Sequence, residues 1–148
     1  MKSKIASIII ATICTNVIAS PDITDQIVMG SGPDTYEASP EVVCLKYNAF
    51  SHNHGIRVAR FTNVTDVEVH AFRGCLNLEE LYLPKLESVK NLAGTFAFCN
   101  RLSLVDLSSI EFTEDIKTRS GFPWGAPNLE IKFVFKNGIF DRLGNRVS

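Results

Sequence analysis

The cysteines are the side chains of this sequence best suited to covalent chemistry. Three of them lie after residue 20, at Cys44, Cys75 and Cys99. An odd number cannot close a disulfide framework within one chain. Cys75 and Cys99 also occupy equivalent places 24 residues apart, where stacked side chains point in parallel and bridge poorly. We therefore expect these two to be free thiols that pack as small apolar groups. A bridge from Cys44 to another chain is left open.

Histidine is the commonest metal ligand among the side chains, and the sequence contains three. His52 and His54 are two residues apart, and His70 follows about one repeat later. This spacing matches no established ligand motif, and no Cys-x-x-Cys pair accompanies it. We expect solvated loop histidines, with neither a metal site nor a cofactor.

Sequence motifs of catalysis are missing. The chain contains no Gly-x-Ser-x-Gly, no phosphate-binding glycine loop and no His-Glu-x-x-His. The neighbouring carboxylates Glu79 and Glu80 would point to opposite faces of a strand, so they cannot act as a facing acid–base pair. We predict no catalytic residue and a protein that is not an enzyme.

The composition is that of one ordinary globular domain. The chain has 148 residues, of which 45% are hydrophobic and 21% charged, and its formal net charge is −1. No run or patch of basic residues is visible, which argues against nucleic acid as a partner.

A repeat organises the centre of the chain, because residues 67–108 match themselves at an offset of 24 residues. The shared pattern is Phe-x-x-Cys-x-x-Leu-x-x-Leu-x-Leu, with valine at one position, and its end places two side chains on one face of a strand. One turn alone has nowhere to bury that face, so turns must stack. This predicts an α/β-type repeat solenoid: a short leucine-rich repeat stack of about three to four turns of 22–24 residues, with a parallel strand face and irregular caps. The predicted structural core is Phe72, Cys75, Leu78, Leu81, Leu83, Phe96, Cys99, Leu102, Val105 and Leu107.

The first residues resemble an export signal. Lys2 and Lys4 precede an apolar segment, residues 5–18, that is too short for a membrane-spanning helix. Residues 1–19 are expected to be a signal peptide, with no membrane span after cleavage and a secreted or cell-surface location. Asn63 begins an N-glycosylation sequon, whose use depends on the host cell.

The next segment carries no hydrophobic period. Residues 20–41 contain three prolines and two glycines, which indicates a flexible leader with one short strand near Ile27 to Met29. The leucine-rich repeat domain with its C-terminal cap is expected to span residues 42–148. A strand from Glu41 to Tyr47 should cover the open end of the stack.

Weaker turns flank the central repeat. Ala49 and Phe50 open a degenerate first turn in which Asn53 takes the cysteine position, and Phe122 is the candidate phenylalanine of a last turn. Alternation over residues 129–135 predicts a strand with Leu, Ile and Phe side chains on its buried face. A hairpin turn at residues 136–138 should lead into a returning strand.

The residues from Ala71 to Pro84 resemble the BspA-like, treponemal-type class of leucine-rich repeats, and Thr95 to Leu102 match again. The resemblance covers about residues 49–135. It implies a secreted or surface protein of host-associated microbes that acts as an adhesin or scaffold rather than as an enzyme. Phe98 stands where the neighbouring turn has Gly74, and we expect it to fill a gap on the convex side.

Outward side chains of stacked strands would form one continuous face. Arg60, Tyr82 and Asp106 are expected in one row across three strands, and Tyr and Arg are enriched at binding hot spots. This favours a non-catalytic module that binds a protein or cell-surface ligand. The alternative is a structural or assembly component of an extracellular layer, which self-associates through the solenoid ends. The candidate face comprises Val58, Arg60, Glu80, Tyr82, Leu104 and Asp106.

Overall fold

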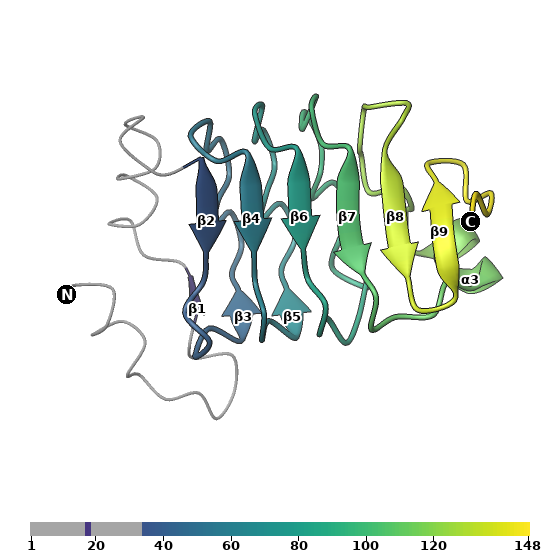
Figure 1. The fold of residues 1–148 in the computed structure, drawn as a ribbon, viewed down its shortest axis with the longest axis horizontal. Helices are drawn as coiled ribbons and strands as arrows, with labels where there is room; N and C mark the ends of the chain where they lie inside the picture. Colours follow the sequence, from purple (N-terminus) through teal and green to yellow (C-terminus); the bar gives the residue numbers. More distant parts are fainter. Residues whose placement is uncertain (1–16, 19–33) are drawn as a thin grey trace.

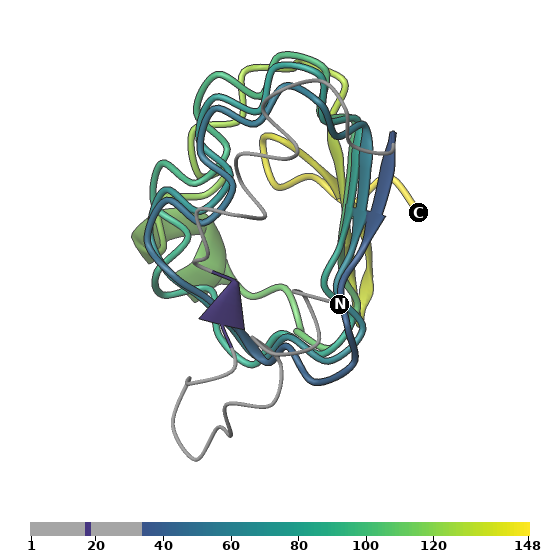
Figure 2. The same cartoon turned by 90° about the vertical axis from the view of Figure 1, so that its left-hand side faces the viewer.

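The computed structural model describes residues 17–18 and 34–148, which form a β-solenoid of about three turns with parallel strands and little helix (Figure 1). The described elements are β1 (Val17–Ile18), β2 (Thr35–Glu37), β3 (Cys44–Leu45), β4 (Val58–Arg60), β5 (Asp66–Val67), β6 (Glu80–Tyr82), β7 (Leu104–Leu107), α3 (Glu114–Arg119), β8 (Lys132–Phe135) and β9 (Gly138–Asp141). Seen along the axis, each turn is an oval, with the larger sheet on one long side and α3 on the opposite side (Figure 2).

Two sheets are built from successive turns. The larger has the strand order β2-β4-β6-β7-β8-β9 and is parallel except for β9, which is antiparallel to β8. In its register Leu81 lies between Ala59 and Val105, the pairing expected from the repeat offset. The smaller sheet has the order β1-β3-β5 and is also parallel.

The ten predicted core positions all lie inside the solenoid, with exposed fractions of 2% or less. Along β6 and β7 they alternate with half-buried outward side chains, because successive strand residues point to opposite faces. Aromatic rings continue the core from turn to turn, with Phe50 and Phe72 stacked at a centroid distance of 5.5 Å. Apolar burial between turns therefore holds the stack together.

Cys44, Cys75 and Cys99 are all buried, and Cys75 and Cys99 form no disulfide. The Cys75 thiol donates to the Phe50 carbonyl at 3.0 Å, and the Cys99 thiol donates to the Phe72 carbonyl at 3.0 Å. Interaction with Cys99, together with burial, raises the pKa of the Cys75 thiol well above its ordinary value. Each thiol therefore packs in the interior and also links its turn to the preceding one as a hydrogen-bond donor, which was not predicted.

The larger sheet begins within the segment expected to be a flexible leader, because Thr35–Glu37 form β2 and pair in register with β4. Tyr36 accounts for this. Its ring packs edge-on against Phe50 at 5.2 Å and lies 5.7 Å from Phe61. A single half-buried aromatic ring thus fixes a strand that carries no hydrophobic period.

The other N-terminal expectations are met only in part. The strand expected from Glu41 to Tyr47 is limited to Cys44–Leu45, and it belongs to the smaller sheet. Of the expected signal peptide, the structure describes Val17–Ile18, which pair in parallel with β3. The strand expected near Ile27 to Met29 lies outside the described residues.

The C-terminal cap contains the expected hairpin and an unexpected helix. β8 and β9 pair across the turn that ends at Gly138. Leu129 is 74% exposed, contrary to the alternation, because the strand begins only at Lys132. Helix α3 was not predicted, and its N-terminus is capped by Thr113, whose side chain accepts the Ile116 N–H. It is the one helix of the described residues, so the α/β character and the leucine-rich class remain predictions.

The aromatic residue of the last turn is Trp124 rather than Phe122. Trp124 is fully buried and packs edge-on against Phe96, with the ring centroids 6.2 Å apart. Phe122 is half-buried beside it. The prediction was wrong because this turn is longer: Trp124 follows Phe96 at an offset of 28 residues instead of 24.

Left-handed backbone recurs at one corner of the solenoid, where His52, Gly74 and Phe98 follow one another from turn to turn with φ of 60°, 75° and 64°. A Cβ atom on Gly74 would lie 2.6 Å from His52 Nδ1, so this position requires glycine. We had expected Phe98 to fill a gap on the convex side, but it does not. Its side chain is 56% exposed, and the Arg73 guanidinium lies 5.6 Å from its ring centroid.

Candidate binding face

One row of outward side chains crosses the larger sheet near the start of each strand. The register places Val58 of β4 beside Glu80 of β6, and Glu80 beside Leu104 of β7. The row extends to Thr35 on one side and to Lys132 on the other. Its centre is half-buried and its two ends are exposed, so it offers aliphatic surface around one carboxylate.

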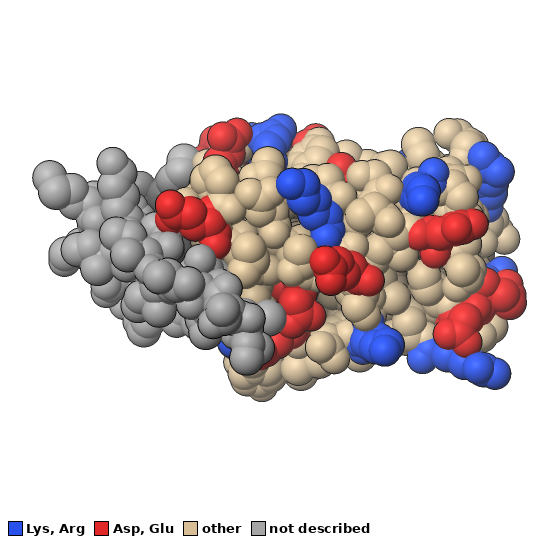
Figure 3. All heavy atoms as spheres, turned by 90° about the horizontal axis from the view of Figure 1, so that it is seen from below, with Lys and Arg blue, Asp and Glu red and all other residues tan. Residues whose placement is uncertain are grey.

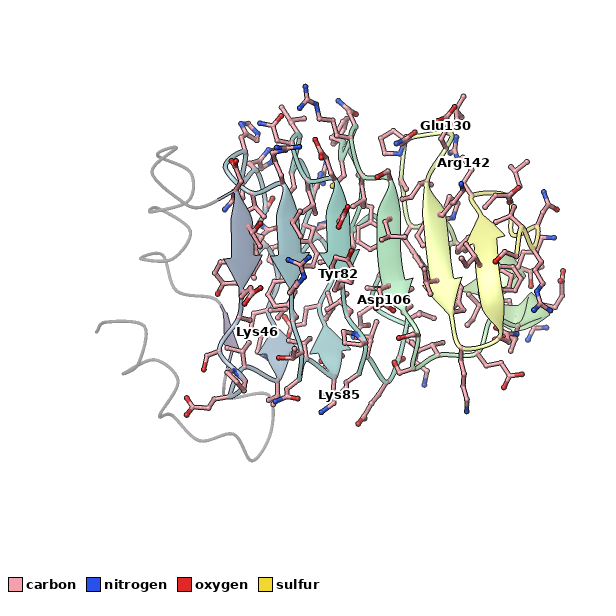
Figure 4. All side chains as sticks on the ribbon, viewed as in Figure 1. Lys46, Tyr82, Lys85, Asp106, Glu130 and Arg142 are labelled. Atoms are coloured by element: carbon pink, nitrogen blue, oxygen red, sulfur yellow. The ribbon has the colours of Figure 1, made fainter. Side chains whose placement is uncertain are left out.

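A second row lies two residues further along each strand. It places Arg60 beside Tyr82 and Tyr82 beside Asp106, and it extends to Glu37 on β2 and to Val134 on β8. Figure 4 shows Tyr82 and Asp106 on the neighbouring strands β6 and β7. The six residues selected from the sequence therefore share one face of one sheet.

Tyr82 is held from two sides at the centre of this face. The Arg60 guanidinium carbon lies 4.9 Å from the centroid of the Tyr82 ring. The Tyr82 hydroxyl donates to Glu80 Oε2 at 2.7 Å, and Arg60 Nη1 lies 3.9 Å from Glu37 Oε1. The tyrosine ring is therefore positioned before any ligand arrives.

These neighbours also set the ionisation of the phenol. The hydrogen bond to Glu80 is the main cause that raises the pKa of Tyr82. Burial and the negative charges of Glu80 and Asp106 act in the same direction, while the positive charge of Arg60 opposes them. The hydroxyl stays protonated at neutral pH and remains a hydrogen-bond donor.

Two members of the second row escaped the sequence prediction. Glu37 was assigned to the leader and Val134 to the cap. Glu37 left a signal, since Thr35-Tyr36-Glu37 alternates polar, aromatic and polar residues about one repeat before Val58-Ala59-Arg60. Val134 could have been placed by aligning its strand with β7, although the longer last turn conceals that alignment.

Glu79, the neighbour of Glu80, belongs to a separate charged cluster that lies just before the start of β6. Its carboxylate accepts from Arg57 Nε at 3.2 Å and from Arg57 Nη2 at 2.9 Å, and Arg101 Nη1 lies 3.8 Å away. The hydrogen bond from Arg57 is the main cause that lowers the pKa of Glu79. The two neighbouring carboxylates therefore have different partners, as their opposite strand directions require.

The histidines lie away from this face. His52 packs over Gly74, and His70 lies 3.2 Å from where a Cβ atom on Gly94 would be. Within residues 17–18 and 34–148, no group of three or more His, Cys, Asp or Glu side chains is arranged to hold a metal ion. In the same part of the chain, no helix has the length and apolarity needed to cross a bilayer.

Charges of both signs are interspersed on the side of the molecule seen from below, with no extended region of one sign among the described residues there (Figure 3).

No match was found when the chain was compared with protein-family models, with curated proteins and with solved structures.

Proposed function

We propose that this protein is a non-catalytic binding module that works outside the producing cell, secreted or at the cell surface. Its ligand is a protein or a cell-surface component, bound in an adhesin-like role by the outer face of the larger sheet. The observation that carries the proposal is Tyr82, held between Arg60 and Glu80 at the centre of that face. A tyrosine fixed in advance loses little conformational freedom on binding, and tyrosine and arginine dominate interface hot spots.

The mixed chemistry of the face favours a protein-like ligand. Val58 and Leu104 contribute aliphatic surface, while Arg60 and Asp106 present opposite charges on either side of Tyr82. An aromatic centre with a polar rim is the usual composition of protein–protein contacts. A nucleic acid would require a predominantly basic surface instead.

We also propose a repeat class for the solenoid. We assign the solenoid to the leucine-rich repeats of the BspA-like type, on the motif from Ala71 to Pro84 and its recurrence from Thr95 to Leu102. The one-turn register between Leu81 and Val105 supports the assignment. The secreted or surface location follows from this resemblance and from the signal-like residues 1–19.

A pull-down from a host-cell surface extract tests the proposal. The bait is the native protein beside a variant in which Arg60, Tyr82 and Asp106 are all alanine. The control variant carries Lys46→Ala and Glu68→Ala, which change charge on the smaller sheet. We expect a partner that the native and control proteins retain and the triple variant loses. Retention by all three proteins would place the binding elsewhere.

An assembly role is a second candidate, favoured by the terminal strand of the larger sheet. The Asp34 carbonyl and the Ala38 amide bond to β4, so alternation directs the backbone groups of Thr35 and Glu37 away from β4. Among the described strands β2 has no neighbour on that side, and such an edge can template another chain. Sedimentation velocity at increasing concentration tests this role, which predicts growing assemblies rather than a constant monomer.

A further inference from the structure

The smaller sheet ends at β5, although the next turn of the solenoid could have added a further parallel strand to it. The Thr65 amide donates to the Val43 carbonyl at 2.9 Å, and one turn later the Glu87 amide donates to the Thr65 carbonyl at 2.9 Å. The bonding pattern of the smaller sheet therefore reaches residues 87–90. The next turn does not continue it.

The chain is drawn away at that point by the C-terminal hairpin. The Ile110 carbonyl accepts from the Lys136 amide at 2.8 Å, and Phe112 exchanges two hydrogen bonds with the Asn137 side chain at 2.9 Å. Helix α3 follows, and none of its residues is buried. The position of the missing strand is left as a groove between residues 87–90 and α3.

This groove is open to solvent and is lined by residues 87–90 on one side and by residues of α3 on the other. Its apolar lining includes Val89, Ile110 and Ile116, and charged side chains stand at its rim. By the alternation of the smaller sheet, the Glu87 carbonyl and the Val89 amide point toward the groove. Neither makes a backbone hydrogen bond to any described residue. The groove therefore combines a strand edge with an apolar floor.

The side chains of the smaller sheet indicate what would fit. One column carries Leu45, Val67 and then, continuing the same offset, Val89, all of them buried. The adjoining column carries Lys46, Glu68 and Lys90, which alternate in charge, and Lys46 Nζ pairs with Glu68 Oε1 at 2.6 Å. The next member of the first column would be apolar, and the next member of the second would be acidic.

We propose that the groove binds an extended peptide segment of a partner protein, which adds to the edge at residues 87–90 as a parallel strand. Its apolar residue packs on Val89, Ile110 and Ile116, and the acidic residue that follows pairs with Lys90. A basic residue two positions before the apolar one pairs with Glu87. Asp115 and Arg119 pair with each other at 3.1 Å, whereas Glu87 and Lys90 take part in no ion pair within the described residues. This site is separate from the face that carries Tyr82 and does not depend on it.

Two blocked hexapeptides of identical composition test the proposal. One is acetyl-Thr-Lys-Thr-Val-Glu-Thr-amide, and in the other the Lys and Glu are exchanged. Each is titrated into the ¹⁵N-labelled full chain, and amide shifts are followed by NMR. We expect the first peptide to shift the Val89 amide and the amides of residues 110–121, and to bind about threefold or more tightly than the second.

A charge reversal in the protein supplies the matched control. The Lys90→Glu variant should weaken binding of the first peptide and abolish the preference between the two peptides, because Glu87 still favours the first while the new glutamate favours the second. Lys132→Glu on the larger sheet should leave the preference unchanged. Shifts that are absent at millimolar peptide, or equal for both peptides, would overturn the proposal. So would shifts of the same amides with protein concentration alone, since a second copy of the chain would then be the occupant.

Discussion

The two sheets of this solenoid stack the same turns but present different chemistry outward. On the larger sheet the outward residue changes type at every turn, from Arg60 to Tyr82 to Asp106. On the smaller sheet the outward column alternates lysine and glutamate, and Lys46 and Glu68 neutralise each other across neighbouring strands. The inward residues of both sheets are uniformly apolar, as stacking requires.

This difference suggests that the outward side chains of the smaller sheet serve the stacking of turns, whereas those of the larger sheet are available for recognition. Charges that pair within the chain hold turns together and leave little for a ligand. The row of Arg60, Tyr82 and Asp106 differs in residue type from turn to turn, so a periodic stack does not require its composition. On this reasoning we propose the larger sheet as the recognition surface, with a second proposed site where the smaller sheet ends beside α3.

The largest expected effect breaks both sheets at once. Leu81→Asp places a carboxylate at a fully buried position in the middle of the stack, which costs several kcal/mol out of a total stability of ~5–15 kcal/mol. Urea unfolding should show no cooperative transition. Leu129→Asp, the same change at a 74% exposed residue, should unfold like the parent. A cooperative transition in Leu81→Asp would show that the register is wrong.

A smaller effect concerns the first strand of the larger sheet. Burial raises the pKa of Tyr36 to about 12. Because the folded-state value is the higher one, this contribution to stability is complete below pH 10 and is lost as the pH rises toward 12. The loss should be at most about 2 kcal/mol, since part of the ring meets solvent. Chemical unfolding between pH 8 and 11.5 should show it in the native protein, and Tyr36→Phe should be less sensitive.

The corner between the sheets provides the third test. Gly74→Ala meets a left-handed backbone and the His52 ring at once, and should cost about 1–2 kcal/mol. Gly121→Ala is the matched control, because its φ of 78° is similar and its nearest contact is an ordinary 3.9 Å. Thermal unfolding should rank the two variants in that order. Adding His52→Ala should remove most of the difference, and an unchanged difference would exclude the ring contact as its cause.

The smallest expected effect lies in the charge column of the smaller sheet. Lys46→Met should lower the free energy of unfolding by less than about 1 kcal/mol, and less still at high salt. The hydrogen bond from Lys46 is the main cause that lowers the pKa of Glu68, so the effect should be present above pH 4.5 and fade as the pH falls below it. Lys136→Met serves as the control. An effect that persisted at pH 2 would have to come from packing of the lysine chain.

Most of the fold that could be predicted from the sequence followed from the offset between repeats. It placed Leu81 against Val105, and it brought Arg60, Tyr82 and Asp106 into one row. Both results follow from strict periodicity, because equivalent residues of stacked turns must be neighbours. The hairpin at the C-terminus was predictable for a local reason, a glycine turn between alternating residues.

The features that were missed are those that interrupt the period. β2 is a three-residue strand fixed by the ring of Tyr36, and no window of so few residues shows a pattern. Helix α3 adds residues to the last turn, so Trp124 falls outside the offset that joins Phe72 to Phe96. Phe98 adopts a left-handed backbone that glycine would normally occupy, and residue type alone gave no warning of it.

The most direct test of the recognition surface uses the tyrosines of the chain as reporters. Tyr82 lies at the centre of the proposed face, while Tyr47 is 56% exposed and follows β3 of the smaller sheet. Nitration of both residues would be measured by mass spectrometry, with and without the partner captured in the pull-down, and each residue compared with itself. Bound partner should protect Tyr82 and leave Tyr47 unchanged. Protection of Tyr47 with unchanged nitration of Tyr82 would contradict the assignment of the larger sheet as the binding face.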